Sequence, residues 1–440
     1  MAKRIFIKTW GCQMNVLDSE TLQGQFAAAG YSPGEGAEDA DVIILNTCSV
    51  REHAENKVLS ELGRLKSIKA RRPEVTIVLA GCMAERLGPR IRARYPQVDI
   101  VLGTRRLGDC LRLVAESGGC GVFIGDEGES YPPRDVRQRA SRVQAFVSVM
   151  RGCENYCAYC IVPYVRGRQA SRPEGEIIDE IEALAEDGVR EVTLLGQNVT
   201  AYGRDAGEKG ALCRLLGRLE GIAGIEWVKF ITSHPRDTGE DVFRAMRDLP
   251  KVCGYMHLPA QSGSDRILAA MKRGYTRSEY LAKVQLLRET AGDVSIAGDF
   301  IVGFPGETEG DFLETVDLVR KVGYKNSFIF KYSPREGTAA SLLRDDVPVA
   351  EKKRRNNELL RIQAEASLSH NRSFVGRTVK VLVDGTEKKG GRRLSGRTAG
   401  EEIVIFEGPP DLVGGFSQVG ITSATAITLF GEVAGGERRP

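Results

Sequence analysis

Short β-branched apolar runs alternate with amphipathic helical stretches over most of this 440-residue chain, and the alternation limits the folds open to it. In the first hundred residues the runs read RIFIKTW, DVIILNT, EVTIVLA and VDIVLGT, each followed by a loop or a helical pattern. Such runs predict parallel strands joined by helical crossovers. We therefore expect an α/β protein whose amino-terminal domain, residues 1–120, has a flavodoxin-like parallel sheet.

Three cysteines follow strands of this predicted sheet. Cys12, Cys48 and Cys82 each lie just after an apolar run. In a parallel sheet the carboxyl ends of the strands lie along one edge, so residues far apart in sequence can converge there. One cysteine at such a point would be interpreted as a small buried apolar residue. Because three occupy equivalent positions, the pattern favours a metal site.

A second α/β segment is predicted over residues 143–370, after a linker at residues 121–142 that is rich in glycine, proline and charge. Its strands are expected in AFVSVM, EVTLLG, WVKFIT, GYMHLP, SIAGDFIVG and SFIFKYS. About six strand and helix pairs are too few for a closed eight-stranded barrel, so we expect a partial (β/α) barrel. Residues 371–440 carry short alternating runs broken by glycine, which predict a small antiparallel β-barrel.

The charge and cysteine content exclude some classes of protein. The formal net charge of +3 does not by itself indicate a nucleic-acid-binding protein, although residues 351–397 hold thirteen basic against five acidic residues. The ten cysteines favour metal or catalytic chemistry over a disulfide framework. No apolar run approaches the roughly 18 residues that a membrane span needs. We therefore expect a cytoplasmic protein without membrane contact.

The segment RGCENYCAYCIVPYVRGRQASR places three thiols, Cys153, Cys157 and Cys160, within eight positions. A structural zinc site needs four protein ligands, and neither a fourth cysteine nor a histidine follows closely. A four-iron cluster bound by three thiolates keeps one iron free for another ligand. The spacing therefore favours an iron–sulfur centre with an open position, and a zinc or redox-sensing site is the alternative.

Polar or glycine-rich stretches follow the later strands of the predicted barrel. They contain Gln197, Asn198, Ser233, His234, Gln261, Ser262, Gly303 and Pro305. Turn chemistry or helix capping explains any one of them equally well. Their recurrence at the same predicted edge favours a cofactor pocket.

The spacing of Cys153, Cys157 and Cys160, with Tyr159 before the last cysteine, resembles the signature of the radical S-adenosylmethionine superfamily. The resemblance implies a [4Fe-4S] cluster on these cysteines, whose free iron binds the amino and carboxylate groups of S-adenosylmethionine. An electron from the cluster would cleave this cofactor to a 5′-deoxyadenosyl radical. By the same resemblance, the cofactor-binding residues are Tyr159, Gln197, Asn198, Ser233, Gln261, Val302 and Gly303.

The order of the segments is similar to that of the methylthiotransferase family, and this resemblance extends over the whole chain. The motifs KTWGCQMN, YCIVPYVRGRQASR and SGRTAGEEIVIFEG resemble the branch that methylthiolates carbon 2 of isopentenyladenosine at position 37 of tRNA. In this family the amino-terminal cysteines bind a second [4Fe-4S] cluster, and a carboxy-terminal TRAM domain binds RNA. The resemblance therefore makes Cys12, Cys48 and Cys82 ligands of the second cluster, and all six cysteines catalytic.

The implied partners are tRNA, a reduced flavodoxin- or ferredoxin-type electron donor and a sulfur donor, with the enzyme acting as a monomer. A base in an anticodon loop must be splayed out while basic side chains hold the phosphates. The candidate RNA contacts are Arg166, Arg168, Arg172, Arg273, Tyr275, Arg392, Arg393 and Arg397. A solvated surface explains any one of these arginines equally well.

Two alternatives stand beside this interpretation. The first is a methylthiotransferase that acts on threonylcarbamoyl-adenosine in tRNA or on an aspartate of a ribosomal protein. The second is a non-enzymatic iron–sulfur protein that binds RNA and senses oxidants. The remaining cysteines, Cys110, Cys120, Cys213 and Cys253, fall outside both predicted ligand sets, and we expect them to be structural.

Overall fold

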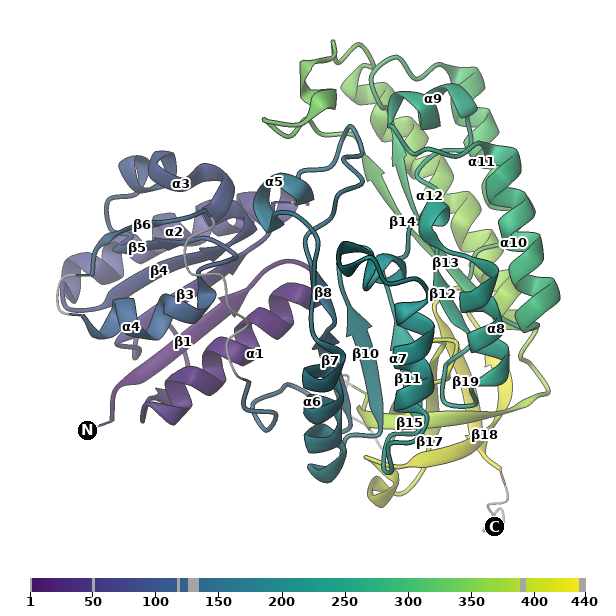
Figure 1. Ribbon diagram of the computed structural model, residues 1–440, viewed down its shortest axis with the longest axis horizontal. Helices are drawn as coiled ribbons and strands as arrows, with labels where there is room; N and C mark the ends of the chain where they lie inside the picture. Colours follow the sequence, from purple (N-terminus) through teal and green to yellow (C-terminus); the bar gives the residue numbers. More distant parts are fainter. Residues whose placement is uncertain (1, 50–51, 117–118, 126–133, 388–392, 435–440) are drawn as a thin grey trace. The chain divides into compact units, whose positions relative to one another are not determined.

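The computed structural model describes residues 2–49, 52–116, 119–125, 134–387 and 393–434 (Figure 1). The chain forms two compact units. The first comprises residues 1–140, 146–154 and 160–170, and the second comprises residues 141–145, 155–159 and 171–440. None of the described helices is long and apolar enough to cross a lipid bilayer.

The first unit is built on a parallel sheet with the strand order β2-β1-β3-β4-β5-β6. The strands are β1 (Arg4–Thr9), β2 (Ser32–Pro33), β3 (Val42–Thr47), β4 (Thr76–Gly81), β5 (Ile100–Leu102) and β6 (Gly121–Phe123). The order of the first five is that of flavodoxin-like folds, so the predicted architecture is confirmed. Strand β6 lies inside the range predicted to be a linker, because three residues are too few to give a periodic signal.

Helices cover both faces of this sheet. They are α1 (Gln13–Ala28), α2 (Glu52–Arg71), α3 (Cys82–Arg94) and α4 (Cys110–Ala115). On β3, Ile43 and Leu45 pack in a core with α2 and α3, whereas Val42 and Ile44 pack in a second core with α1 and α4. Because side chains alternate between the two faces of a strand, a continuous apolar run requires helices on both faces.

Two three-stranded sheets follow along the chain, β11-β10-β7 and β12-β13-β14, and strands β10 to β14 belong to the second unit. Their strands are β7 (Gln144–Ser148), β10 (Glu191–Leu195), β11 (Trp227–Phe230), β12 (Tyr255–His257), β13 (Ser295–Val302) and β14 (Asn326–Lys331). The pairs β10–β11, β12–β13 and β13–β14 are parallel. These are the six strands predicted from the sequence, and their open arrangement agrees with the predicted partial barrel.

Helices accompany the strands of the partial barrel. They are α6 (Glu174–Glu186), α7 (Ala211–Leu219), α8 (Glu240–Asp248), α9 (Asp265–Ala270), α10 (Arg277–Ala291), α11 (Glu309–Val322) and α12 (Val349–Arg372). Figure 1 shows α10, α11 and α12 beside β13 and β14. Along the chain, β8 (Met150–Arg151), α5 (Val162–Arg166) and β9 (Ala170–Ser171) come between β7 and α6.

The chain ends in a closed five-stranded barrel with the order β15-β16-β17-β19-β18. Its strands are β15 (Thr378–Thr386), β16 (Arg393–Arg397), β17 (Ile403–Glu407), β18 (Phe416–Ala424) and β19 (Thr428–Val433). The predicted small barrel is confirmed, and its strand pairs are antiparallel except for β17–β19, which is parallel. The reason is topological, because strand direction cannot alternate all the way around a closed ring with an odd number of strands.

The five-stranded barrel packs on the α/β part of the second unit through charged and aromatic contacts. Lys229 on β11 has a side chain only 1% exposed, and its Nζ lies 2.7 Å from a carboxylate oxygen of Glu191 and 2.5 Å from one of Glu401. Nearby, the rings of Trp227 and Phe416 meet edge to face with centroids 4.8 Å apart. A buried lysine is tolerated because two carboxylates compensate it.

Candidate iron–sulfur and cofactor sites

Cys12, Cys48 and Cys82 lie at the carboxyl ends of three neighbouring strands of the first unit. Cys12 is the N-cap of α1 after β1, Cys48 follows β3, and Cys82 begins α3 after β4. Because β1, β3 and β4 are adjacent in the sheet, their carboxyl ends form one edge. The structure therefore gathers the three cysteines that occupy equivalent places in the sequence pattern.

Asn15, in the first turn of α1, links these strand ends, although sequence reasoning did not single it out. Its amide donates to the carbonyl oxygen of Thr47 at 3.2 Å, and its Oδ1 accepts from the thiol of Cys12 at 3.4 Å. Gly11 permits this close packing, because a Cβ there would lie only 2.9 Å from the Cβ of Cys48. The motif GCQMN contains Asn15, but the sequence does not indicate that this side chain contacts Cys12 and Thr47.

The three thiols of this edge differ in exposure and influence one another. Cys48 and Cys82 are buried and Cys12 is exposed. Burial raises the pKa of the Cys82 thiol to about 11; the charge of Arg166 opposes this rise, and Cys48 and Cys12 add to it. Among the described residues, no three such side chains are placed to hold a single metal ion. Three thiols at one sheet edge are the kind of ligand set that a four-iron cluster uses, because each thiolate binds its own iron.

The cysteines of the Cys-x3-Cys-x2-Cys motif lie in the loop between β8 and α5. Gly152 shapes the start of this loop: its φ is +72°, and a Cβ there would lie 1.8 Å from the carbonyl oxygen of Arg168. The amide of Cys153 then donates to the carbonyl oxygen of Gly167 at 3.2 Å. Cys157 is buried and the other two thiols are half-buried. The backbone thus holds the start of the loop against the residues that follow α5.

Arg273 approaches the middle cysteine of this loop. Its Nη1 donates to Sγ of Cys157 at 3.2 Å and to the hydroxyl of Tyr159 at 3.4 Å. Its other donors reach the carbonyl oxygen of Pro259 at 2.8 Å and the hydroxyl of Tyr275 at 2.9 Å. Arg273 is 3% exposed. Arg273 and Tyr275, which the sequence suggested as RNA contacts, therefore lie against the cysteine loop.

His234 also lies beside Cys157, with Nε2 at 4.0 Å from the sulfur. Burial and the positive charge of Arg273 lower the pKa of His234 to about 3, so its imidazole is neutral at pH 7. Its Nδ1 accepts a hydrogen bond from the amide of Arg236 at 3.2 Å. Cys157 therefore has one cationic and one neutral nitrogen group as neighbours.

Tyr159 lies in the cysteine loop, and the other residues predicted to bind cofactor lie at the carboxyl ends of β10, β11, β12 and β13. Asn198, Ser233, Gln261 and Val302 are buried. Most informative is Gln197, whose Oε1 is buried without a hydrogen-bond partner in the described part of the chain. Because buried polar atoms are almost always hydrogen-bonded, this oxygen fits a site that a polar ligand completes.

The backbone at two of these strand ends adopts an uncommon conformation. Thr232, after β11, has a φ of +67°, and Gln261, after β12, has a φ of +73°. Residues other than glycine seldom adopt such angles, and those that do cluster at functional sites. At the end of β13, the amide of Gly303 donates to the carboxylate of Glu307 at 2.9 Å.

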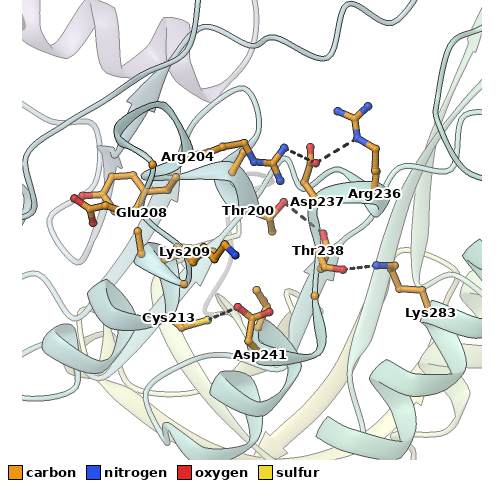
Figure 2. A pocket seen from close by; sticks show the side chains of 18 residues that line it. Thr200, Arg204, Glu208, Lys209, Cys213, Arg236, Asp237, Thr238, Asp241 and Lys283 are labelled. Carbon is orange, nitrogen blue, oxygen red and sulfur yellow. Dashed lines mark hydrogen bonds and ion pairs between the residues drawn. The ribbon is translucent and has the colours of Figure 1, made fainter.

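A cavity of about 590 Å³ lies between the loops after β10 and β11 and the first turns of α7 and α8. Figure 2 shows Asp237 between Arg204 and Arg236 in its wall. Asp237 accepts from Arg204 at 2.7 Å and from Asn198 at 2.6 Å. Burial would raise the pKa of Asp237, but these hydrogen bonds outweigh burial and lower it. Lys283 donates to the carbonyl oxygen of Thr238 in the same wall.

The other basic residues suggested as RNA contacts differ in exposure. Three have buried or partly buried side chains paired with carboxylates: Arg166, Arg172 and Arg397. Arg168 and Arg393 are exposed. Arg392 lies outside the described residues.

Models of three known domains match successive parts of the chain. The family described as uncharacterized protein family UPF0004 matches residues 4–103, the radical SAM superfamily matches residues 147–319, and the TRAM domain matches residues 372–434. Among solved structures, the radical S-adenosylmethionine methyltransferase TsrM from Kitasatospora setae has a TM-score of 0.58 at 14% identity, covering 78% of this chain and 74% of that one. This likeness shows a shared fold. The chain is thus a radical S-adenosylmethionine protein.

Curated relatives match almost the whole length. The tRNA-2-methylthio-N(6)-dimethylallyladenosine synthase of Sulfurihydrogenibium sp. (strain YO3AOP1) is 43% identical over 99% of this chain and 100% of its own. The synthases of Syntrophomonas wolfei and Moorella thermoacetica are both 44% identical, over 97% and 99% of this chain and 97% and 99% of their own. The chain belongs to this family of methylthiotransferases, which confirms the predicted branch, that of the MiaB-type synthases that methylthiolate isopentenyladenosine. Its cofactors are S-adenosylmethionine and [4Fe-4S] clusters.

Proposed function

We propose that this chain replaces the hydrogen on carbon 2 of isopentenyladenosine, at position 37 of tRNA, with a methylthio group. One observation carries the proposal: the chain matches synthases named for this product over 97% to 99% of its length at 43% to 44% identity. Carbon 2 bears an unactivated hydrogen, so acid–base groups have no good means of removing it. When bound, a reduced [4Fe-4S] cluster and S-adenosylmethionine supply a radical that can.

The six cysteines are proposed as two sets of ligands. Cys153, Cys157 and Cys160 would hold the cluster that binds S-adenosylmethionine, with Arg273 orienting Cys157 and Tyr159. Support comes from the open three-thiol spacing.

Cys12, Cys48 and Cys82 would hold the second cluster. Their shared sheet edge and mutual electrostatic influence support this assignment. The ligand of the cofactor pocket would be S-adenosylmethionine, with the unpaired Oε1 of Gln197 accepting one of its N–H or O–H groups. Asn198, Ser233, Gln261, Val302 and Gly303 would line the rest of this pocket.

RNA recognition is assigned to exposed basic side chains. Arg168 and Arg393 are exposed and would contact phosphates. Arg392, which lies outside the described residues, stays a candidate from the sequence alone. Arg393 also pairs with Glu387 at 2.8 Å, but its side chain is exposed. The buried arginines Arg166 and Arg172 are less suited to phosphate contact, because an RNA phosphate could not reach them without rearrangement. The enzyme would work in the cytoplasm as a monomer, with a reduced flavodoxin- or ferredoxin-type protein as electron donor and a separate sulfur donor.

The proposal is tested by mass spectrometry of tRNA nucleosides from cells that lack the gene. We expect 2-methylthio-isopentenyladenosine to disappear and isopentenyladenosine to accumulate. Unchanged levels of the methylthio nucleoside, with loss of methylthiolation on threonylcarbamoyl-adenosine or on a ribosomal protein, would support the sister activities instead. An anaerobically reconstituted chain with about four irons in place of about eight, and no 5′-deoxyadenosine production, would favour a non-enzymatic sensor.

The roles of the two cysteine sets are separated by one pair of variants. Cys157→Ala should abolish reductive cleavage of S-adenosylmethionine, because it removes a ligand of the cluster that binds this cofactor. Cys48→Ala should retain cleavage and lose sulfur transfer. Both are measured on one preparation, as 5′-deoxyadenosine and as methylthiolated tRNA by mass spectrometry. The reverse pattern would exchange the assigned roles.

A further inference from the structure

Arg166 is the last residue of α5 and lies six residues after Cys160 in the sequence. Its side chain is 4% exposed. A guanidinium stays charged in proteins and carries five N–H donors, so its burial requires partners that satisfy both its charge and its hydrogen bonds.

Two partners of Arg166 belong to the first unit. Nη2 donates to a carboxylate oxygen of Asp18 on α1 at 2.8 Å, and Nε donates to Sγ of Cys82 at 3.4 Å. The carboxylate compensates the charge, which explains how an arginine is accommodated there. It does not explain why another donor of the same group points at one of the three strand-end cysteines.

The surroundings fix the guanidinium at this sulfur. The carbonyl oxygen of Val165 accepts from the hydroxyl of Thr104 at 2.5 Å, which fastens the end of α5. The buried side chains of Ile161 and Val165 pack directly against Cys82. The short helix is therefore anchored at the thiol by apolar contact, backbone hydrogen bonding and the ion pair with Asp18.

We propose that Arg166 is a positioning residue for the amino-terminal [4Fe-4S] cluster, and that its hydrogen bond to Cys82 makes this cluster easier to reduce. The inference rests on the proposed assignment of Cys12, Cys48 and Cys82 as ligands. Reduction adds negative charge that spreads onto the coordinating sulfurs. A cation and an N–H donor at one sulfur stabilise the reduced state more than the oxidised state, and hydrogen bonds to sulfur are among the main determinants of cluster potential.

The test uses the full chain with Cys153, Cys157 and Cys160 all replaced by alanine, which retains only the amino-terminal ligand set. After anaerobic reconstitution, the midpoint potential of the remaining cluster is measured by a redox titration followed by electron paramagnetic resonance. Adding Arg166→Met should move the midpoint to a more negative potential. Adding Asp18→Asn should move it to a more positive potential, because the arginine then lacks its compensating carboxylate.

The matched control is Arg168→Met, which removes an exposed arginine two residues away and should leave the potential where it was. Equal potentials for the parent and Arg166→Met at equal iron content would overturn the inference while leaving the ligand assignment intact. If Arg166→Met fails to assemble a cluster, the midpoint potential of the Asp18→Asn variant is the test. A potential in that variant that is not more positive than that of the parent would overturn the inference. A parent that binds no iron would instead refute the ligand assignment, and the inference with it.

Discussion

Each proposed cluster site contains one buried arginine that donates to one thiol: Arg166 to Cys82 at 3.4 Å and Arg273 to Cys157 at 3.2 Å. The two arginines differ in how they are compensated. Arg166 has a carboxylate partner in Asp18, whereas the described hydrogen-bond partners of Arg273 are neutral hydroxyl and carbonyl groups and the sulfur itself. Among its described hydrogen-bond partners, Arg273 therefore has no carboxylate, and Cys157 is the group that can take negative charge beside it.

Gly152 offers a test of how strictly the cysteine loop is shaped. Gly152→Ala should prevent assembly of the cluster on this loop, because the new Cβ would collide with the carbonyl oxygen of Arg168 and left-handed alanine itself costs roughly 1–2 kcal/mol. Iron content should fall from about eight to about four per chain, and cleavage of S-adenosylmethionine should cease. The control is Gly175→Ala on α6, where an added Cβ meets no atom within 4 Å. Full iron content in Gly152→Ala would contradict this account of the loop.

At the residue scale, the sequence indicated the thiols but not the groups that hold them. Cysteines after successive strands could be placed on one edge because parallel strands have a regular geometry. The contacts made by Asn15, Arg166 and Arg273 depend on tertiary packing between segments that are distant in sequence, and no local pattern carries that information. For this reason the sequence suggests Arg166 and Arg273 as RNA contacts, whereas both are buried in the structure.

Among the elements, the turn between β16 and β17 connects the five-stranded barrel to two parts of the α/β fold. Glu402 in this turn accepts from the hydroxyl of Ser295 on β13 at 2.7 Å and lies 3.0 Å from Nε2 of His370 on α12. Burial favours its protonated form, but the hydrogen bond to His370 and the charge of Lys325 outweigh burial and lower the pKa of Glu402 to about 2.

This carboxylate should make the second unit sensitive to acid. The pKa of Glu402 is lower in the folded state than its ordinary value of 4.5, so its contribution to stability is present above pH 4.5 and disappears as the pH falls toward 2. The loss amounts to about 3 kcal/mol. Urea unfolding of the apo-protein, followed by Trp227 fluorescence in a Trp10→Phe background, measures it. Glu402→Gln should flatten the dependence on pH in this window by a similar amount, and an unchanged slope would contradict the assignment.

The elements predicted from sequence are those with strong periodicity. All six strands of the partial barrel and the four main strands of the first sheet come from long apolar runs. Strands β6, β16 and β18 have weak periodic signals, because β6 has three residues and the other two combine polar residues with glycine. They are strands because neighbouring strands pair with them, which is a tertiary effect.

On the scale of the whole molecule, the five-stranded barrel of the second unit shares a buried junction with the partial barrel. Leu382 from β15 is buried against Trp227 and Cys253, and Lys229 is neutralised partly by Glu401. Removing the five-stranded barrel would expose the apolar surface around Trp227 to water and would leave the buried Lys229 without one of its two carboxylates. We therefore expect the five-stranded barrel and the partial barrel to depend on each other for stability, although they are separate segments of the sequence.

We expect the two parts of the second unit to unfold together. Leu429→Ala, which truncates a fully buried side chain of the five-stranded barrel, should cost about 2–5 kcal/mol. The chain has two tryptophans, so in a Trp10→Phe background Trp227 reports on the junction alone. In the parent, part of the unfolding followed by circular dichroism should coincide with the Trp227 fluorescence transition. In Leu429→Ala both should shift to lower urea concentration together, since the junction couples the two parts of the second unit. Ile427→Ala, at a side chain 74% exposed, is the matched control and should shift neither. A barrel that unfolds first, with Trp227 unaffected, would show that the junction contributes little to stability.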